Sequence, residues 1–132
     1  MNILEIIFLG CYHVLDKTIY SNGHGRSIGP KEHAFFIAFL FHGINIWTLI
    51  SYVLANFFLK NTPLYAGLSI GIAVFVVGYL SFFKRKADEV VAHRISNLKA
   101  ILFVLIAVIY IIISTYFMFK VGDYIREMST KN

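Results

Sequence analysis

HAFFIAFLFHGINIWTLISYVLANFFL, residues 33–59, contains no Asp, Glu, Lys or Arg over its whole length. A helix needs about 20 consecutive, mostly apolar residues to cross the hydrocarbon core of a bilayer. The segment meets this requirement, so we expect it to be a membrane span. Residues 64–83 and 100–119 also lack these four charged residue types and are predicted to form the second and third spans.

The overall composition leads to the same class of protein. Hydrophobic residues make up 58% of the 132 residues and charged residues only 14%, whereas a soluble domain carries about 25% charged residues. A chain of this length cannot bury so much apolar surface in a water-soluble core. The single cysteine excludes an internal disulfide. We therefore predict one all-α transmembrane domain over residues 1–132, with membrane lipid as its surroundings.

Residues 1–20 have a different pattern, because apolar and polar side chains lie on opposite sides of a helical wheel. This pattern predicts an amphipathic helix that lies in the membrane interface. The alternative is a short fourth span whose polar side faces a bundle or a pore. The apolar side comprises Ile3, Leu4, Ile7, Phe8, Cys11, Val14 and Leu15, and the polar side comprises Asn2, Glu5, His13, Asp16 and Lys17.

Residues 84–99, KRKADEVVAHRISNLK, link the second and third spans and contain neither Gly nor Pro. We expect a helical linker here. Basic residues favour the cytosolic side of a membrane, and the side that includes this linker carries eight of them against four on the other. The linker is therefore predicted to be cytosolic. The eight are Lys17, Arg26, Lys31, Lys84, Arg85, Lys86, Arg94 and Lys99.

The basic residues of the linker, Lys84, Arg85, Lys86 and Arg94, have two interpretations. They can set the topology and contact anionic lipid headgroups. Alternatively, several copies around one axis of an oligomer could bind a nucleotide or a nucleic acid through its phosphates.

A polar stripe runs along the first span. His42, Asn45, Tyr52 and Asn56 fall within an arc of about 80° at 100° per residue. Polar side chains are costly against lipid and turn toward protein or water. One interpretation is hydrogen bonding between helices of the bundle. The other is that these four residues line a pore or a ligand cavity.

The second span has a face of small residues, Gly67, Gly71, Gly78 and Ser81, and the first two of these glycines have the GxxxG spacing. Glycines allow two helices to approach closely in lipid. Two interpretations remain open here, because the close contact can form within one chain or at an oligomer interface.

The sequence offers no support for catalysis. The three predicted spans contain no carboxylate for proton coupling. The single cysteine excludes a redox dithiol, and the histidines lack the spacing of a zinc site. We predict that the protein is not an enzyme and uses neither a metal nor another cofactor.

In its layout the chain resembles the small multi-span membrane effectors of bacterial anti-phage systems, such as the HalB-like channel of Hailong. The resemblance lies in size, in three or four helices, in the stripe at His42, Asn45, Tyr52 and Asn56, and in the basic residues 84–86. It implies a homo-oligomeric channel, of tetrameric type, in a bacterial inner membrane. It also implies gating by a nucleotide or oligonucleotide on the cytosolic face.

A protomer with three spans is too small to enclose a pore alone, so the pore of such a channel would be shared between copies. Two alternatives remain. The chain could be an accessory or scaffold subunit of a larger membrane complex, in which case the polar stripe meets a partner helix. It could also be a transporter of small substrates.

Overall fold

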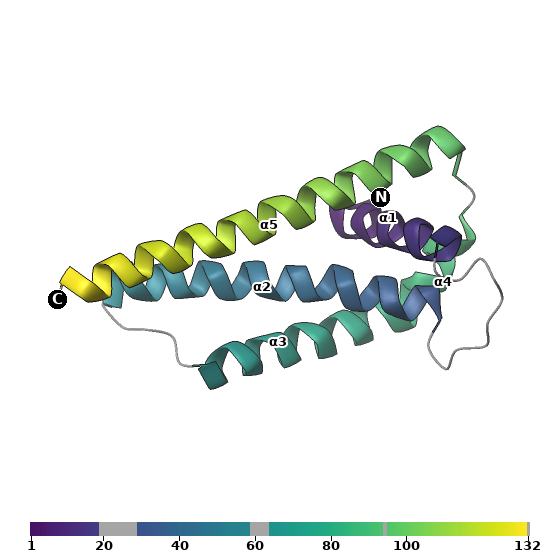
Figure 1. The fold of residues 1–132 in the computed structure, drawn as a ribbon. Coiled ribbons are helices and arrows are strands. Elements are labelled where there is room, and N and C mark those ends of the chain that lie inside the picture. The colour runs from purple at the N-terminus through teal and green to yellow at the C-terminus, as the bar shows by residue number, and fades with distance from the viewer. Residues whose placement is uncertain (19–28, 59–63, 94, 132) are drawn as a thin grey trace.

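The computed structural model describes residues 1–18, 29–58, 64–93 and 95–131. These residues form helices, and no strand occurs among them (Figure 1). The all-α fold predicted from the sequence is confirmed. The elements are α1 (Ile3–Thr18), α2 (Pro30–Phe58), α3 (Leu64–Gly78), the π-helical turn η1 (Tyr79–Phe83), α4 (Lys84–Ala92) and α5 (Asn97–Lys131).

Among the described residues, three helical segments are long and apolar enough to cross a membrane, namely Pro30–Phe57, Ala66–Ala92 and Asn97–Lys131. The three expected spans are thereby confirmed as candidates by length and composition. The first segment begins at Pro30, because the fixed φ of proline and its missing N–H suit the first position of a helix. Glu32 lies in the first turn, near the positive end of the helix dipole. Residues 59–63, which connect the first two spans in the sequence, lie outside the described residues.

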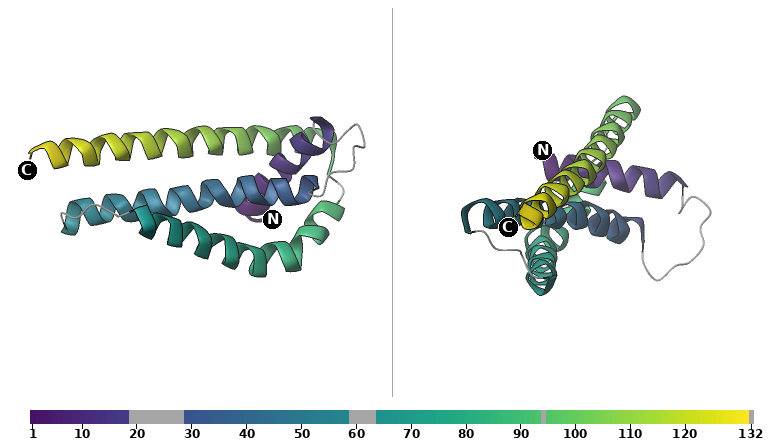
Figure 2. Two further views of the ribbon diagram at one scale, coloured as in Figure 1. Left: turned by 60° about the horizontal axis from the view of Figure 1, so that its bottom comes forward. Right: turned by 60° about the vertical axis from the view of Figure 1, so that its left-hand side comes forward.

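Helices α2 and α5 and the continuous run from α3 through η1 into α4 form a layer in which α2 lies between the other two (Figures 1 and 2). Helix α1 crosses α2 and α5 at a steep angle, as the left-hand view of Figure 2 shows. It lies at the end of the bundle where α4 and the start of α5 are found. One end of the bundle is therefore thicker than the other.

The protein core is located at this thicker end. Phe8 and Leu9 of α1 are the largest fully buried side chains among the described residues, with 0% and 1% exposure. The Phe8 ring meets the edge of the Phe82 ring at a centroid distance of 5.1 Å. The ring centroids of Phe39 and Phe82 are 5.8 Å apart. By contrast, most apolar side chains of α5 are exposed and are placed to face lipid.

Helix α1 buries a face that the helical wheel located only in part. Ile7, Phe8 and Cys11 are buried as expected, but Leu9 and Gly10 are buried as well. Ile3 and Val14, which the wheel placed on the apolar side, are 60% and 40% exposed. With 16 residues, α1 is shorter than the roughly 20 that a span requires. Its buried face packs on protein, against α2 and α5.

The described part of the linker is helical on both sides of a break after α4, and each helical part continues a candidate span. Helix α4 continues directly from η1 and ends at Ala92. The next residue, His93, has an extended backbone with φ −69° and ψ 110°. Helix α5 then begins at Asn97, three residues before the predicted span. Ser96 caps this start, because its side-chain oxygen accepts a hydrogen bond from the backbone N–H of Lys99 at 3.3 Å.

The thiol of Cys11 offers a test of how tightly α1 is packed. The side chain is 6% exposed, and burial raises the pKa of the thiol to about 11 from an ordinary value of 9.0. Only the thiolate reacts rapidly with alkylating reagents. At pH 7 to 8 the thiolate fraction of Cys11 is therefore about 100-fold smaller than that of an unperturbed cysteine.

We therefore expect maleimide to label Cys11 at least about 100-fold more slowly than a free thiol at pH 7.5. The rate should rise as the pH approaches 11, since the thiolate then forms. Mass spectrometry of quenched samples measures the rate, and protein unfolded in denaturant is the control. Labelling of folded protein at the unfolded rate would contradict the packing of α1.

Candidate functional site

Four polar side chains join α2 to α5 at the middle of the bundle, and we call this group the inner cluster: His42, Asn45, Tyr110 and Ser114. The Asn45 amide nitrogen donates hydrogen bonds to Tyr110 Oη at 2.9 Å and to Ser114 Oγ at 2.8 Å. His42 Nδ1 lies 3.4 Å from the same Tyr110 oxygen. His42 and Asn45 lie three residues apart and share one face of α2. Tyr110 and Ser114 lie four residues apart and share one face of α5.

A second group lies nearer the C-terminal ends of α2 and α5, and we call it the outer cluster: Tyr52, Asn56 and Tyr124. The Tyr124 hydroxyl donates to Asn56 Oδ1 at 2.6 Å. The Asn56 amide donates in turn to the backbone oxygen of Tyr52 at 2.9 Å. The rings of Tyr52 and Tyr124 are 5.7 Å apart, and the two residues are 41% and 39% exposed.

All four residues of the predicted stripe thus contact α5, directly or through a neighbour. The partners on α5 were not identified from the sequence. A signal for them exists, because Tyr110, Ser114 and Tyr124 fall within an arc of about 80° on a helical wheel. The inner cluster uses both hydrogens of the Asn45 amide, which would be costly to leave unpaired at membrane depth.

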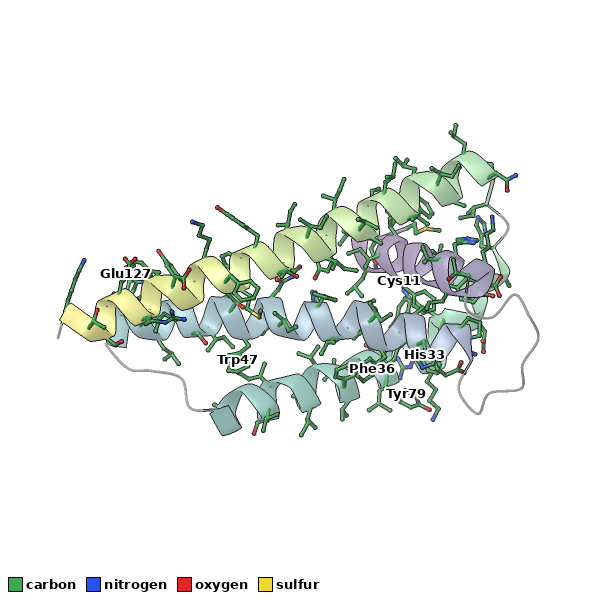
Figure 3. The ribbon with its side chains drawn as sticks, in the orientation of Figure 1. Cys11, His33, Phe36, Trp47, Tyr79 and Glu127 are labelled. Carbon is green, nitrogen blue, oxygen red and sulfur yellow. The ribbon has the colours of Figure 1, made fainter. Side chains whose placement is uncertain are left out.

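The small-residue face is divided between two environments. An added Cβ at Gly67 would lie 2.5 Å from the Trp47 ring, and one at Gly78 would collide with the Phe39 ring. Both glycines therefore allow α3 to approach α2 within the chain, and Figure 3 shows Trp47 on the side of α2 that faces α3. A Cβ at Gly71 would meet nothing within 4 Å. Ser81 is exposed, and its hydroxyl donates to Val77 O of its own helix.

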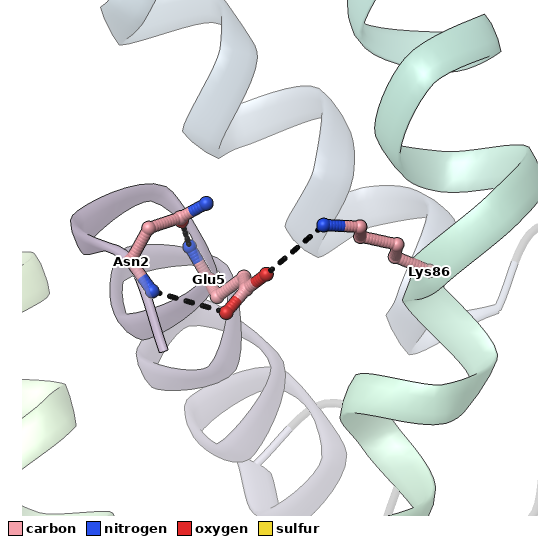
Figure 4. A network of polar contacts seen from close by, with 3 residues as sticks. All are labelled: Asn2, Glu5 and Lys86. Carbon is pink, nitrogen blue, oxygen red and sulfur yellow. Dashed lines mark hydrogen bonds and ion pairs between the residues drawn. The ribbon is translucent and has the colours of Figure 1, made fainter.

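The basic residues Lys84, Arg85 and Lys86 are exposed on α4, whereas Arg94 lies outside the described residues. Lys86 Nζ lies 4.0 Å from Glu5 Oε1, which joins α4 to α1 (Figure 4). Asn2 and Glu5 also form a reciprocal cap. The Glu5 N–H donates to Asn2 Oδ1 at 2.9 Å, and the Asn2 N–H donates to Glu5 Oε2 at 3.1 Å. This cap fixes the start of α1 beside α4.

A cavity of about 520 Å³ lies between the start of α1, the middle of α2 and the continuous run from α3 through η1 into α4. Most of its wall is apolar. Of the four predicted stripe residues, His42 lines this cavity. The lining residues are Asn2, Leu4, Phe39, His42, Ile46, Ala73, Val74, Val77, Gly78, Ser81, Phe82 and Lys86.

Within the described ranges, no three His, Cys, Asp or Glu side chains are grouped so that they could hold a metal ion. Comparison with protein-family models, with curated proteins and with solved structures finds no match for this chain.

Proposed function

We propose that the protein is a homo-oligomeric membrane channel whose conducting path follows the contact between α2 and α5. The observation that carries this proposal is the line of polar groups formed by the inner and outer clusters. From His42 to Asn56 these groups extend over 14 positions of one helix, or about 21 Å at 1.5 Å per residue. That is most of the roughly 30 Å hydrocarbon core.

The degree of exposure supports a shared path. Ser114 is buried, but His42, Asn45 and Tyr110 are only partly buried, and Tyr52 and Tyr124 are exposed. Polar groups left against lipid cost free energy. A second copy laid over this side would cover them and enclose a polar path between protomers. This arrangement also agrees with a protomer too small to form a pore alone.

The resemblance to anti-phage effectors extends this proposal to gating by a nucleotide or oligonucleotide in a bacterial inner membrane. Lys84 and Arg85 are the residues that would contact its phosphates, since both are exposed on α4. The exposed basic residues of α4 favour binding of an anion at this end of the molecule. The chain's formal net charge of +5 also favours an anionic ligand.

Replacing Asn45 with Leu tests the conducting path. Leu has a similar volume and favours helix, so α2 should form, but the amide that bridges α5 is lost. A change of about 1.4 kcal/mol at the barrier corresponds to a tenfold change in rate. We expect loss of the amide to raise the barrier to conduction by about this amount, so ion flux into liposomes should fall about tenfold. The oligomer should keep its size in detergent.

Thr48→Val is the matched control, because it removes a polar group from the same helix. The Thr48 hydroxyl donates to Ile44 O of α2 itself, so its loss should leave flux unchanged. If the Asn45→Leu oligomer dissociates instead, the polar clusters serve to join helices.

That outcome would favour the second candidate, an accessory or scaffold subunit. The specific observation in its favour is that Asn45 already bonds to Tyr110 and Ser114 within one chain. Size measurement of the protein expressed alone separates the two functions further, because a monomer in detergent would contradict the channel. Uptake of a small solute against its gradient would instead indicate the transporter.

A further inference from the structure

The cavity between α1, α2 and the α3–η1–α4 run is elongated. Its wall on that run extends from Ala73 to Lys86, which is 13 positions or about 20 Å at 1.5 Å per residue. Its volume of about 520 Å³ lies within the range of small-molecule sites. Gly78 contributes no side chain to this wall, and η1 contributes Ser81 and Phe82. π-helical turns are rare and occur frequently at functional sites.

The two ends of the cavity differ in chemistry. The end farther from α4 is lined by apolar side chains, including Ile46, Val74 and Val77. The end nearest α4 carries Asn2, Ser81 and Lys86. A long apolar space with a cation at one end therefore complements an amphiphile that has an anionic head.

Lys86 is available to such a head. Its side chain is 56% exposed, and its ion pair with Glu5 is at the 4.0 Å limit of such contacts. The Glu5 carboxylate is 13% exposed and already accepts the Asn2 N–H. Lys84 and Arg85 precede Lys86 on the same helix and are exposed. A lysine ammonium binds phosphate as a point charge.

We propose that this cavity is a binding site for one acyl chain of an anionic phospholipid, whose phosphate contacts Lys86. The chain lies along the apolar wall, and the headgroup lies at the level of α4. Because α4 is predicted to be cytosolic, the lipid comes from the cytosolic leaflet, where anionic headgroups attract basic segments. This site does not depend on the proposed channel, because lipid can bind whether or not ions pass.

The test is lipid retention by the full chain in a mild detergent. Phosphatidylglycerol and phosphatidylcholine with the same acyl chains are titrated separately, and bound lipid is counted by native mass spectrometry. We expect one phosphatidylglycerol per protomer, bound at least about tenfold more tightly than phosphatidylcholine. Equal affinity for the two lipids would overturn the assignment of the headgroup to Lys86.

Two substitutions locate the site. Lys86→Gln should weaken phosphatidylglycerol binding about tenfold and leave phosphatidylcholine unchanged, whereas Lys84→Gln should change neither, because Lys84 does not line the cavity. Ala73→Phe should abolish retention of both lipids by filling the apolar end of the cavity that lies farther from α4. The control Ile109→Phe adds a ring at a position on α5 that is 54% exposed. Retention unaffected by Ala73→Phe would overturn the proposal.

Two further measurements separate the charge of Lys86 from its ion pair, and the lipid from free phosphate. Lys86→Gln also breaks the contact with Glu5, so Glu5→Gln is needed to break that contact while keeping the cation. Glu5→Gln should preserve or increase phosphatidylglycerol affinity, and a loss equal to that of Lys86→Gln would show that the ion pair itself matters. Millimolar inorganic phosphate should not displace the lipid. Displacement would indicate a site for free phosphate instead.

Discussion

Replacing Gly10 with Ala is expected to loosen α1 from α5. A Cβ at this position would collide with the backbone oxygen of Phe103 and lie 2.8 Å from the Cβ of Ala107. A backbone atom cannot rotate away as the tip of a side chain can, so α1 and α5 must separate. Overpacking of this kind costs about 1–3 kcal/mol. The intrinsic helix propensity of Ala offsets about 1 kcal/mol of it.

We expect a net loss of up to about 2 kcal/mol in the free energy of unfolding, measured by denaturant titration in mixed micelles. Labelling of Cys11 should accelerate in the same variant, because α1 leaves its site more often. Gly122→Ala is the matched control, since a Cβ there meets nothing within 4 Å. It should leave stability unchanged or slightly increase it. Equal effects at the two glycines would contradict the close contact between α1 and α5.

Replacing Phe8 with Ala should have the largest effect on stability. The Phe8 side chain is fully buried and meets Phe82 of η1 edge to face. Truncation of a buried Phe costs about 3–5 kcal/mol, because contacts are lost and a cavity remains. We expect a loss of about 3 kcal/mol or more in the same titration.

Phe57→Ala provides the comparison, because Phe57 lies on α2 and is 76% exposed. A side chain that faces lipid or detergent exchanges one apolar surrounding for another, so its loss should cost little. If Phe8→Ala were as mild as Phe57→Ala, α1 would not be part of the folded core. A large difference between the two would show that the N-terminal helix holds this end of the bundle together.

Both large effects concern α1, which was predicted from the sequence to be an amphipathic helix at the membrane interface. Its contacts give it a second role, because it joins α2, α4 and α5 at one end of the bundle. The contact between Glu5 and Lys86 and the cap formed by Asn2 place its first turn beside the cavity. Any movement of α1 would therefore change the polar end of the proposed lipid site.

The spans could be predicted from the sequence because their signal is local. Residues 33–59 contain no charge, and each such segment must satisfy its backbone hydrogen bonds internally in lipid, which a helix does. The start of the first span was also encoded locally, since α2 begins at Pro30. The stripe from His42 to Asn56 was recognised because helical periodicity fixes which side chains share a face.

The partners of that stripe were decided only by the tertiary structure. Asn45 bonds to residues 65 and 69 positions away, and periodicity gives the face of a helix but not the helix that it meets. The role of Gly10 was hidden for the same reason, because the atom that excludes a Cβ belongs to the backbone of α5. Composition and periodicity thus determined that the chain is a helical membrane protein. Which polar groups are paired, and where a cavity remains, depended on contacts between helices that are distant in the sequence.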